Sequence, residues 1–470
     1  MSRHYAIYDT ETTGPNPTFD QVLQAAGILY DGAFKEMETL DMRARILPHV
    51  VPGPRALEVT GVRPHRLASD DAMAPYDFAC RLQKIFERWA PAIFLGYNTI
   101  RFDEEIVRQT FYLNLLFPYV TNSRGSKRAD LLIMMRALSA IAPGIFTIPL
   151  NEAGKESYRL EHIAPANGFQ DMDAHDALGD VRATAFMAQL CQERAPIAWE
   201  YLLDLADPRF CDEIIAEGEI LLTTHFGISE THHCAVAASC PSNPKQVGVF
   251  DLSADPAPYL DLSAEQIAEA MRTDYKILRT VKTNQQPVIF SVESSLAPAV
   301  SAKTDENGDA VTTALAIRAH RLQQIQDHPT FKLRMAQALQ IRADSFKTEQ
   351  PADARAKQPE EQIYDGFPQG QDKSRQTAFH NAADWDECWA IANAFEDIRL
   401  KRLARRIVLN HAPEVVPETQ RKAMRAGMFR DRVLTQDEAP WTTLADARAG
   451  LEELSDESLK AEVAAWLDDL

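Results

Sequence analysis

Residues 6–14 read AIYDTETTG, an apolar run that ends in two acids and a Thr-Thr-Gly turn. Residues two apart on a β-strand point to the same face, so Asp9 and Glu11 lie side by side at the end of a predicted strand. Two neighbouring carboxylates repel each other, and a hard cation such as Mg²⁺ or Mn²⁺ relieves that repulsion. Taken alone, the pattern more often marks a strand that ends in a solvated acidic turn. The interpretation therefore depends on whether later segments supply partners for this pair.

The composition indicates a globular protein of several domains. A chain of 470 residues corresponds to roughly two to four domains. Its hydrophobic share of 45% and charged share of 25% are ordinary for soluble proteins. No apolar run approaches the roughly 20 residues of a membrane span, and the first residues lack the apolar core of a signal peptide. We therefore expect a cytoplasmic protein without membrane association.

The six cysteines and the net charge of −19 limit the kinds of metal site, disulfide and nucleic-acid surface that the chain can have. The cysteines form no CxxC pair, which favours a reducing compartment and argues against a disulfide framework or a zinc ribbon. Residues 232–240 hold two histidines and two cysteines without the usual zinc-ligand spacing, so a zinc site there is disfavoured. An acidic chain that binds nucleic acid needs a confined basic groove, and such binding weakens steeply with salt.

The first 200 residues or so alternate strands and helices, which predicts an α/β domain with a mixed sheet. Close succession of the first strands predicts an antiparallel meander. The strands are expected over residues 5–9, 22–30 and 43–47. Apolar residues at helical spacing predict helices over residues 77–89, 104–115, 130–138, 160–167 and 174–192.

The character of the sequence changes after residue 205. Segments rich in β-branched residues, separated by Pro, Asn and Gly, predict a small β-rich domain with helical insertions. Its strands are expected at 219–224, 234–238, 246–251 and 286–292, and its helices at 263–272 and 318–326. The polar stretch 347–358 is a linker candidate, and the pattern after it is almost entirely helical.

Three later segments could complete the opening acid pair, of which one, YRLEH at residues 158–162, equally fits an ordinary amphipathic helix with surface charges. Asp103 follows Asn98 at the predicted start of a helix, where an acid also simply complements the helix macrodipole. Residues 174–180 read AHDALGD and lead into another helix. His175 and Asp180 converge if the histidine lies in the loop before that helix and the acid in its first turns. A histidine before a helix is, however, more often a capping or surface residue.

In order and local setting, these residues resemble the DEDDh superfamily of 3′→5′ exonucleases over residues 1–195. The matching residues are Asp9, Glu11, Asp103, His175 and Asp180. Further segments are similar to the bacterial exodeoxyribonuclease I family. They are SYRLEH at 157–162, AHDALGD at 174–180, EQIYDGF at 361–367, and NSR at 122–124 followed by DLL at 130–132.

The resemblance implies an α/β fold with three parts. The first is a ribonuclease-H-like nuclease domain with a mixed sheet, and the second is a small β-barrel-like domain, of the Src-homology-three-like kind, with helical insertions. The third is an all-helical C-terminal domain. The expected boundaries are 1–200 for the exonuclease domain, 201–346 for the barrel-like domain, 347–358 for the linker and 359–470 for the helical domain.

The resemblance also implies an enzyme that hydrolyses single-stranded DNA from its 3′ end, releases nucleoside 5′-monophosphates and acts in DNA repair or recombination. Its cofactors would be two Mg²⁺ ions, with Mn²⁺ as a substitute. Asp9 would bridge both ions, and Glu11 and Asp180 would complete the site of the attacking water. Asp103 would hold the second ion, and His175 would accept a proton from that water.

Contacts to the DNA strand are expected from backbone and side chains near the acids. The candidates are Thr10, Thr12, Thr13, Arg101, Arg124, Lys127, Arg128 and Arg159, with Lys276, Arg279 and Lys282 in the second domain. Residues 398–407, IRLKRLARRI, are either part of a clamp over the strand or a solvated helix face. By the resemblance, the acidic tail of the single-stranded DNA-binding protein is a partner, and the chain acts as a monomer.

Two other functions stay open at this point. The acids do not separate DNA from RNA, because recognition of the 2′-hydroxyl depends on contacts that the sequence does not place. An RNA-preferring 3′→5′ exonuclease is therefore one alternative. The other is a catalytically inert scaffold that binds nucleic acid, against which the complete set of four acids and a histidine argues.

Overall fold

The computed structural model describes residues 3–69, 71–170, 177–226, 228–298, 311–348, 357–435 and 438–470. Contacts within the chain group it into two units. The first comprises Met1–Arg128, Pro149–Met187 and Ala356–Leu470, and the second comprises Ala129–Ile148 and Ala188–Arg355. The predicted linker 347–358 lies largely outside the described residues, and the predicted domain boundaries stay predictions.

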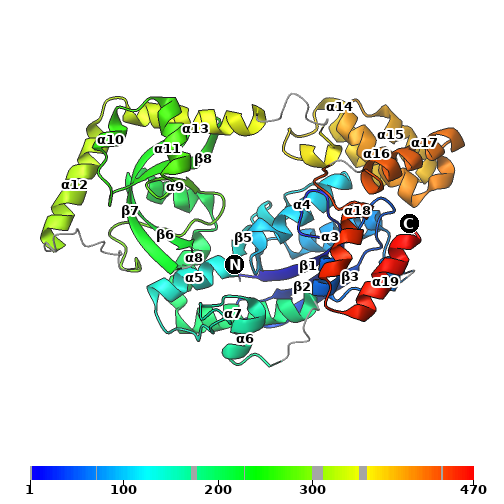
Figure 1. The fold of residues 1–470 in the computed structure, drawn as a ribbon, viewed down its shortest axis with the longest axis horizontal. Coiled ribbons are helices and arrows are strands. Elements are labelled where there is room, and N and C mark those ends of the chain that lie inside the picture. Colours follow the sequence, from blue (N-terminus) through cyan, green and yellow to red (C-terminus); the bar gives the residue numbers. More distant parts are fainter. Residues whose placement is uncertain are drawn as a thin grey trace. The chain divides into compact units, whose positions relative to one another are not determined.

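The first unit is organised around a five-stranded sheet in the order β3-β2-β1-β4-β5 (Figure 1). Its strands are β1 (Tyr5–Thr12), β2 (Val22–Tyr30), β3 (Glu36–Arg43), β4 (Ile93–Gly96) and β5 (Lys127–Asp130). The central strand β1 pairs antiparallel with β2 and parallel with β4. The sheet is therefore mixed, as predicted for a nuclease domain of this kind.

The third strand is one place where the prediction was wrong. It was expected over residues 43–47, but β3 ends at Arg43 and pairs with β2 from Glu36 onward. Only Leu40 and Met42 of β3 are buried, and charged residues occupy most other positions. An edge strand needs few apolar residues, because one side of its backbone and one face can stay in water.

Alternation along β1 places its two faces in different surroundings. Ala6 and Tyr8 belong to the main apolar core, together with aromatic residues of helix α3 such as Phe78 and Phe86. Asp9, the residue after Tyr8, points to the opposite face. The helices of the first 216 residues are α1 (Pro54–Thr60), α2 (Pro64–Leu67), α3 (Pro75–Trp89), α4 (Asp103–Leu113), α5 (Leu131–Ile141), α6 (Leu160–Ala166), α7 (Ala177–Arg194), α8 (Pro196–Asp204) and α9 (Pro208–Ala216).

The second unit has its own antiparallel sheet in the order β10-β6-β7-β8-β9. Its strands are β6 (Glu219–Phe226), β7 (Ile228–Cys240), β8 (Asn243–Asp251), β9 (Leu278–Lys282) and β10 (Ile289–Phe290). In addition to α5, α8 and α9, this unit contains the helices α10 (Ala257–Leu260), α11 (Ala264–Thr273), α12 (Val311–Asp327) and α13 (Phe331–Thr348). A β-rich part with helical insertions is thus present, and its barrel-like closure stays a prediction.

Residues 357–470 are helical, as predicted. They form α14 (Gly370–Asn381), α15 (Trp385–Ala394), α16 (Ile398–His411), α17 (Glu418–Met428), α18 (Leu444–Gly450) and α19 (Glu457–Asp468). Side chains of α14–α16 share a core with Tyr112 and Leu115, and those of α18 and α19 pack against Leu57 of α1. Across the described part of the chain, no helix is long and apolar enough to cross a membrane.

Candidate active site

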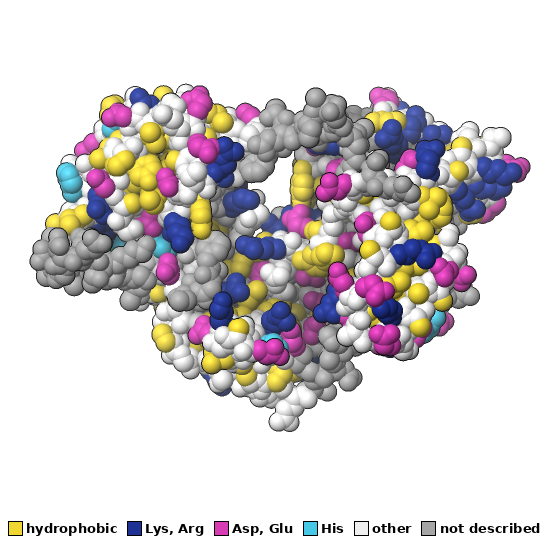
Figure 2. Space-filling view, viewed as in Figure 1, with side chains coloured by type: hydrophobic (Ala, Val, Ile, Leu, Met, Phe, Trp, Pro, Cys, Tyr) yellow, Lys and Arg dark blue, Asp and Glu magenta, His cyan; other side chains and the backbone are white. Residues whose placement is uncertain are grey.

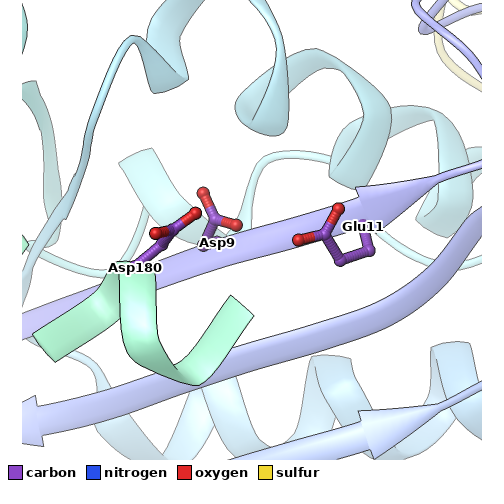
Figure 3. A group of neighbouring side chains, drawn as sticks. All are labelled: Asp9, Glu11 and Asp180. Atoms are coloured by element: carbon purple, nitrogen blue, oxygen red, sulfur yellow. The ribbon is translucent and has the colours of Figure 1, made fainter. Parts of the chain in front are cut away.

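Three carboxylates from two elements come together at the end of β1. Asp9 and Glu11 project from β1, and Asp180 projects from the first turns of α7 toward them (Figure 3). One carboxylate oxygen from each residue lies within 4.8 Å of the others. Within the described ranges, no other group of three or more His, Cys, Asp or Glu side chains meets this spacing. The predicted side-by-side placement of Asp9 and Glu11 is present, and Asp180 joins them.

The turn after β1 is held by close contacts. The Thr13 hydroxyl donates to the Asp20 carboxylate at 2.9 Å and accepts from the backbone N–H of Gln21 at 2.9 Å. Gly14 lies against Asp20, and a Cβ there would come within 2.6 Å of the Asp20 carboxylate. Only glycine fits such an approach, which explains the Thr-Thr-Gly sequence.

The surroundings of Asp9 hold its pKa well above the usual range. Burial contributes most, followed by the neighbouring carboxylates of Asp103, Glu11 and Asp180, which all act in the same direction. Ionisation of the whole cluster is therefore costly in the protein alone. A bound cation would remove that cost.

Asp103 approaches this cluster from the first position of α4. Its carboxylate accepts two hydrogen bonds from Thr10, one from the backbone N–H at 3.1 Å and one from the hydroxyl at 2.6 Å. Asp103 is 5% exposed. The residue between Asp9 and Glu11 thus positions the fourth acid beside them.

Glu104 and Tyr8 form a second connection between α4 and β1, which sequence reasoning missed. The Tyr8 hydroxyl donates to Glu104 at 3.0 Å, and the Thr121 hydroxyl donates to it at 2.6 Å. Arg108 lies 2.7 Å from the same carboxylate, and Glu104 is only 1% exposed. The spacing of Glu104 and Arg108, four residues apart on a helix, was the available signal.

The residues at the candidate site fit a divalent metal centre. Every ligand in the group of three is a carboxylate oxygen, the donor type that hard cations such as Mg²⁺, Mn²⁺ and Ca²⁺ prefer. Burial, followed by the neighbouring carboxylates, raises the pKa of Asp9, so a positive charge would be favoured at the same place. Donor chemistry and electrostatics therefore agree on a cation site.

Comparisons with known proteins show which proteins this chain resembles. Residues 6–187 match the exonuclease family, and residues 357–470 match the exonuclease I C-terminal domain. Over 279 residues, or 57% of this chain, the sequence is 33% identical to exodeoxyribonuclease I of Escherichia coli strain K12. The chain is thus similar to exonuclease I proteins in both its N-terminal and its C-terminal parts. The matched part spans 58% of the length of that E. coli protein.

Solved structures of exonuclease I share the fold along nearly the whole chain. A moderately thermophilic exonuclease I from Methylocaldum szegediense superposes with a TM-score of 0.83 at 25% identity, over 99% of both chains. E. coli exonuclease I in complex with a dA16 oligonucleotide superposes with a TM-score of 0.80 at 23% identity, over 99% of this chain and 98% of the other. The family resemblance inferred from the sequence is confirmed.

The other predicted site residues lie in varied surroundings. His175 lies outside the described residues. The Thr12 hydroxyl donates to the Gly14 carbonyl at 2.9 Å.

The predicted arginine contacts differ in exposure. Arg101 is exposed. The Arg124 side chain is 62% exposed and lies 3.0 Å from Glu87, and the Arg159 side chain is 74% exposed and lies 3.8 Å from Glu161. The Arg128 side chain is 11% exposed and lies 3.6 Å from Glu104. Contact between these residues and a substrate stays a prediction.

Proposed function

We propose that the protein is a 3′→5′ exonuclease that hydrolyses single-stranded DNA and releases nucleoside 5′-monophosphates. The observation that carries the proposal is the meeting of Asp9, Glu11 and Asp180 within 4.8 Å, with Asp103 fixed beside them by Thr10. Similarity to the exonuclease family and to exonuclease I proteins supports the reaction class. A role in DNA repair or recombination is part of the same proposal.

The cofactors we propose are two Mg²⁺ ions, for which Mn²⁺ would substitute. When bound, they would neutralise the charge that develops on the phosphate during cleavage. Asp9 would contact both ions, Glu11 and Asp180 one of them, and Asp103 the other. Thr10 keeps Asp103 oriented, because its two hydrogen bonds leave that carboxylate little rotational freedom. His175 would accept the proton of the attacking water.

Single-stranded DNA is the substrate we propose, and the acidic chain carries basic regions that suit it. Figure 2 shows Lys and Arg side chains gathered over α16 and α17 at the upper right of the view. Arg402, Lys422 and Arg425 of these helices are exposed, as a strand-binding surface requires. An exonuclease I in complex with a dA16 oligonucleotide has the same fold as this chain. The domain boundaries 1–200, 201–346 and 359–470 remain our proposal.

A further partner in this proposal is the single-stranded DNA-binding protein, through its acidic tail. One solved structure that the chain resembles is an ExoI/SSB-Ct complex, with a TM-score of 0.80 over the whole of this chain. A basic surface would attract such a tail, and the association would weaken as salt rises.

Labelled oligonucleotides test the proposed function. A 3′-labelled single strand incubated with the protein and Mg²⁺ should release labelled mononucleotide at once, whereas a 5′-labelled strand should shorten gradually. Both reactions should stop when EDTA replaces Mg²⁺. An RNA strand of the same sequence tests substrate class in parallel. If the DNA strand stays uncleaved under all conditions, the proposal is refuted and an inert module that binds nucleic acid is supported.

A further inference from the structure

The segment 359–364, from the C-terminal region, runs along the helix that carries Asp103. Gln109 of α4 donates through Nε2 to the Glu360 carbonyl at 2.8 Å, and the Tyr112 hydroxyl donates to the Pro359 carbonyl at 2.9 Å. Nearer to Asp103, Glu105 accepts a hydrogen bond from the Tyr364 hydroxyl. Residues 105, 109 and 112 lie one and two turns apart on one face of the helix. The segment therefore contacts α4 along most of its length.

The segment is itself held firmly by a buried ionic cluster. The Glu360 side chain is 3% exposed and lies 2.5 Å from Nη1 of Arg406 and 2.8 Å from Nη1 of Arg432. The Arg432 guanidinium lies 4.3 Å from the ring centre of Trp441 and 5.0 Å from that of Phe19. Separation of a buried carboxylate from its arginines is strongly unfavourable, so this cluster fixes the position of the segment.

Gln109 also connects the segment to the turn that follows β1. The same Nε2 atom that donates to Glu360 lies 3.1 Å from the Thr18 carbonyl, to which it also donates. This side chain of α4 thus joins its own helix to both the turn after β1 and the C-terminal segment. A shift of the segment would therefore disturb α4, which carries Asp103, and the turn that follows the strand of Asp9 and Glu11.

We propose that residues 359–364 position the catalytic centre by holding α4 so that Asp103 stands beside Asp9. The inference rests on the proposed function, in which these two acids hold metal ions. Small displacements of a catalytic group are costly, because its support must keep it within a fraction of an ångström. The C-terminal region then acts on the metal site itself, in addition to any contact with the strand. Tyr364, Tyr112 and Gln109 are positioning residues in this scheme.

Metal binding without DNA tests the proposal, with Mn²⁺ as the probe and electron paramagnetic resonance as the readout. The test variants of the full chain are Tyr364→Phe, Tyr112→Phe and the double variant, each of which removes only hydroxyl groups. We expect the double variant to bind Mn²⁺ about five- to tenfold more weakly, since two hydrogen bonds that hold α4 are lost. The Mg²⁺ concentration for half-maximal turnover should rise by a similar factor, while metal-free affinity for single-stranded DNA stays unchanged.

A matched control and a site variant separate the possible failures. Tyr201→Phe removes an equivalent hydroxyl-to-carbonyl bond, 2.9 Å to Ile289, in the other unit, and it should leave Mn²⁺ binding unchanged. Asp9→Asn should abolish tight Mn²⁺ binding, and if it does not, the proposed metal centre is wrong. Suppose that Asp9→Asn abolishes Mn²⁺ binding, but that Tyr364→Phe and the double variant bind Mn²⁺ like the wild type. The metal centre then stands, and only the positioning role of residues 359–364 is overturned.

Discussion

The acid cluster of Asp9, Glu11 and Asp180 is partly exposed and the carboxylate of Glu360 is buried, and their charges are balanced in different ways. Burial and three neighbouring acids raise the pKa of Asp9. Burial also acts to raise the pKa of Glu360, but Arg406 and Arg432 outweigh it and lower that pKa to about 2. One cluster gathers like charges, and the other pairs opposite charges.

This difference in charge balance distinguishes the candidate metal site at Asp9 from the ionic cluster at Glu360, which stabilises the surrounding fold. Where a buried carboxylate only stabilises the fold, the chain supplies its own counter-charge, as at Glu360 and again at Glu104 with Arg108. Where acids are gathered beside one another, folding is made less favourable, and such an arrangement is typical of a functional site. The comparison therefore points to a cation as the missing counter-charge at Asp9, independently of any family resemblance.

The largest expected effect is on turnover when a ligand of the acid cluster is neutralised. Asp180→Asn should lower the rate of DNA hydrolysis by about 10³-fold or more, because charge stabilisation at the reacting phosphate is lost. His175→Ala should also remove most turnover. Binding of a single strand in EDTA should stay within a few-fold of the wild type in both variants. Glu193→Gln, an exposed change on the same helix as Asp180, serves as the control.

Next in size is a stability effect of opposite sign in the two clusters. Glu360→Gln should destabilise the protein by about 3–5 kcal/mol, because Arg406 and the buried Arg432 lose their charged partner. Glu361→Gln keeps a side-chain oxygen that accepts from the Gln358 N–H, so it should change the stability by less than about 1 kcal/mol. Asp9→Asn should instead stabilise the metal-free protein, on the order of 1 kcal/mol, since it removes one of the repelling charges. Urea unfolding in EDTA measures all three, and destabilisation by Asp9→Asn would contradict the comparison.

The same contrast predicts a pH dependence. The pKa of Glu360 falls from an ordinary 4.5 to about 2, through Arg406 and Arg432 acting against burial. Its stabilisation is complete above about pH 4.5 and is lost as the pH falls toward 2. The raised pKa of Asp9 has the opposite consequence, because its charge destabilises the fold at high pH and is relieved on acidification. The stability gap between wild type and Glu360→Gln should therefore shrink by about 2 kcal/mol as urea titrations move from pH 7 to pH 3. A gap that does not change with pH would show that Glu360 is not held ionised by its arginines.

Local pattern was sufficient to predict the elements that carry the acid cluster. Strand alternation placed Asp9 and Glu11 on one face, and the helix that follows residue 176 begins at Ala177, so Asp180 lies in its first turn as expected. The helical character of the region after residue 358 was also predicted, because buried side chains such as those of α16 repeat every three or four residues. The strand over 36–43 was missed because it buries only two apolar side chains.

The support of the site could not be predicted, because it depends on contacts between distant residues. Nothing in the local sequence distinguishes Glu360 from its neighbour Glu361, yet only Glu360 lies between arginines 46 and 72 residues further along the chain. Thr10 was expected to contact substrate through its backbone, whereas its hydroxyl and N–H both donate to Asp103, 93 residues away. Such pairings follow from the folded arrangement of α4 on β1 rather than from any pattern of spacing.

The smallest effect concerns Thr10, which links the acid cluster to the helix held by the Glu360 segment. Thr10→Val keeps the shape of the side chain and removes one hydrogen bond to Asp103, so turnover should fall about five- to tenfold, corresponding to roughly 1 kcal/mol. Thr12→Val removes a bond of similar length to the Gly14 carbonyl and leaves the Asp103 carboxylate untouched. If Thr10 acts by positioning Asp103, only Thr10→Val raises the Mg²⁺ concentration needed for half-maximal turnover. If both threonines instead act on the DNA strand, the two variants raise the KM for DNA alike, and the Mg²⁺ dependence of each stays that of the wild type.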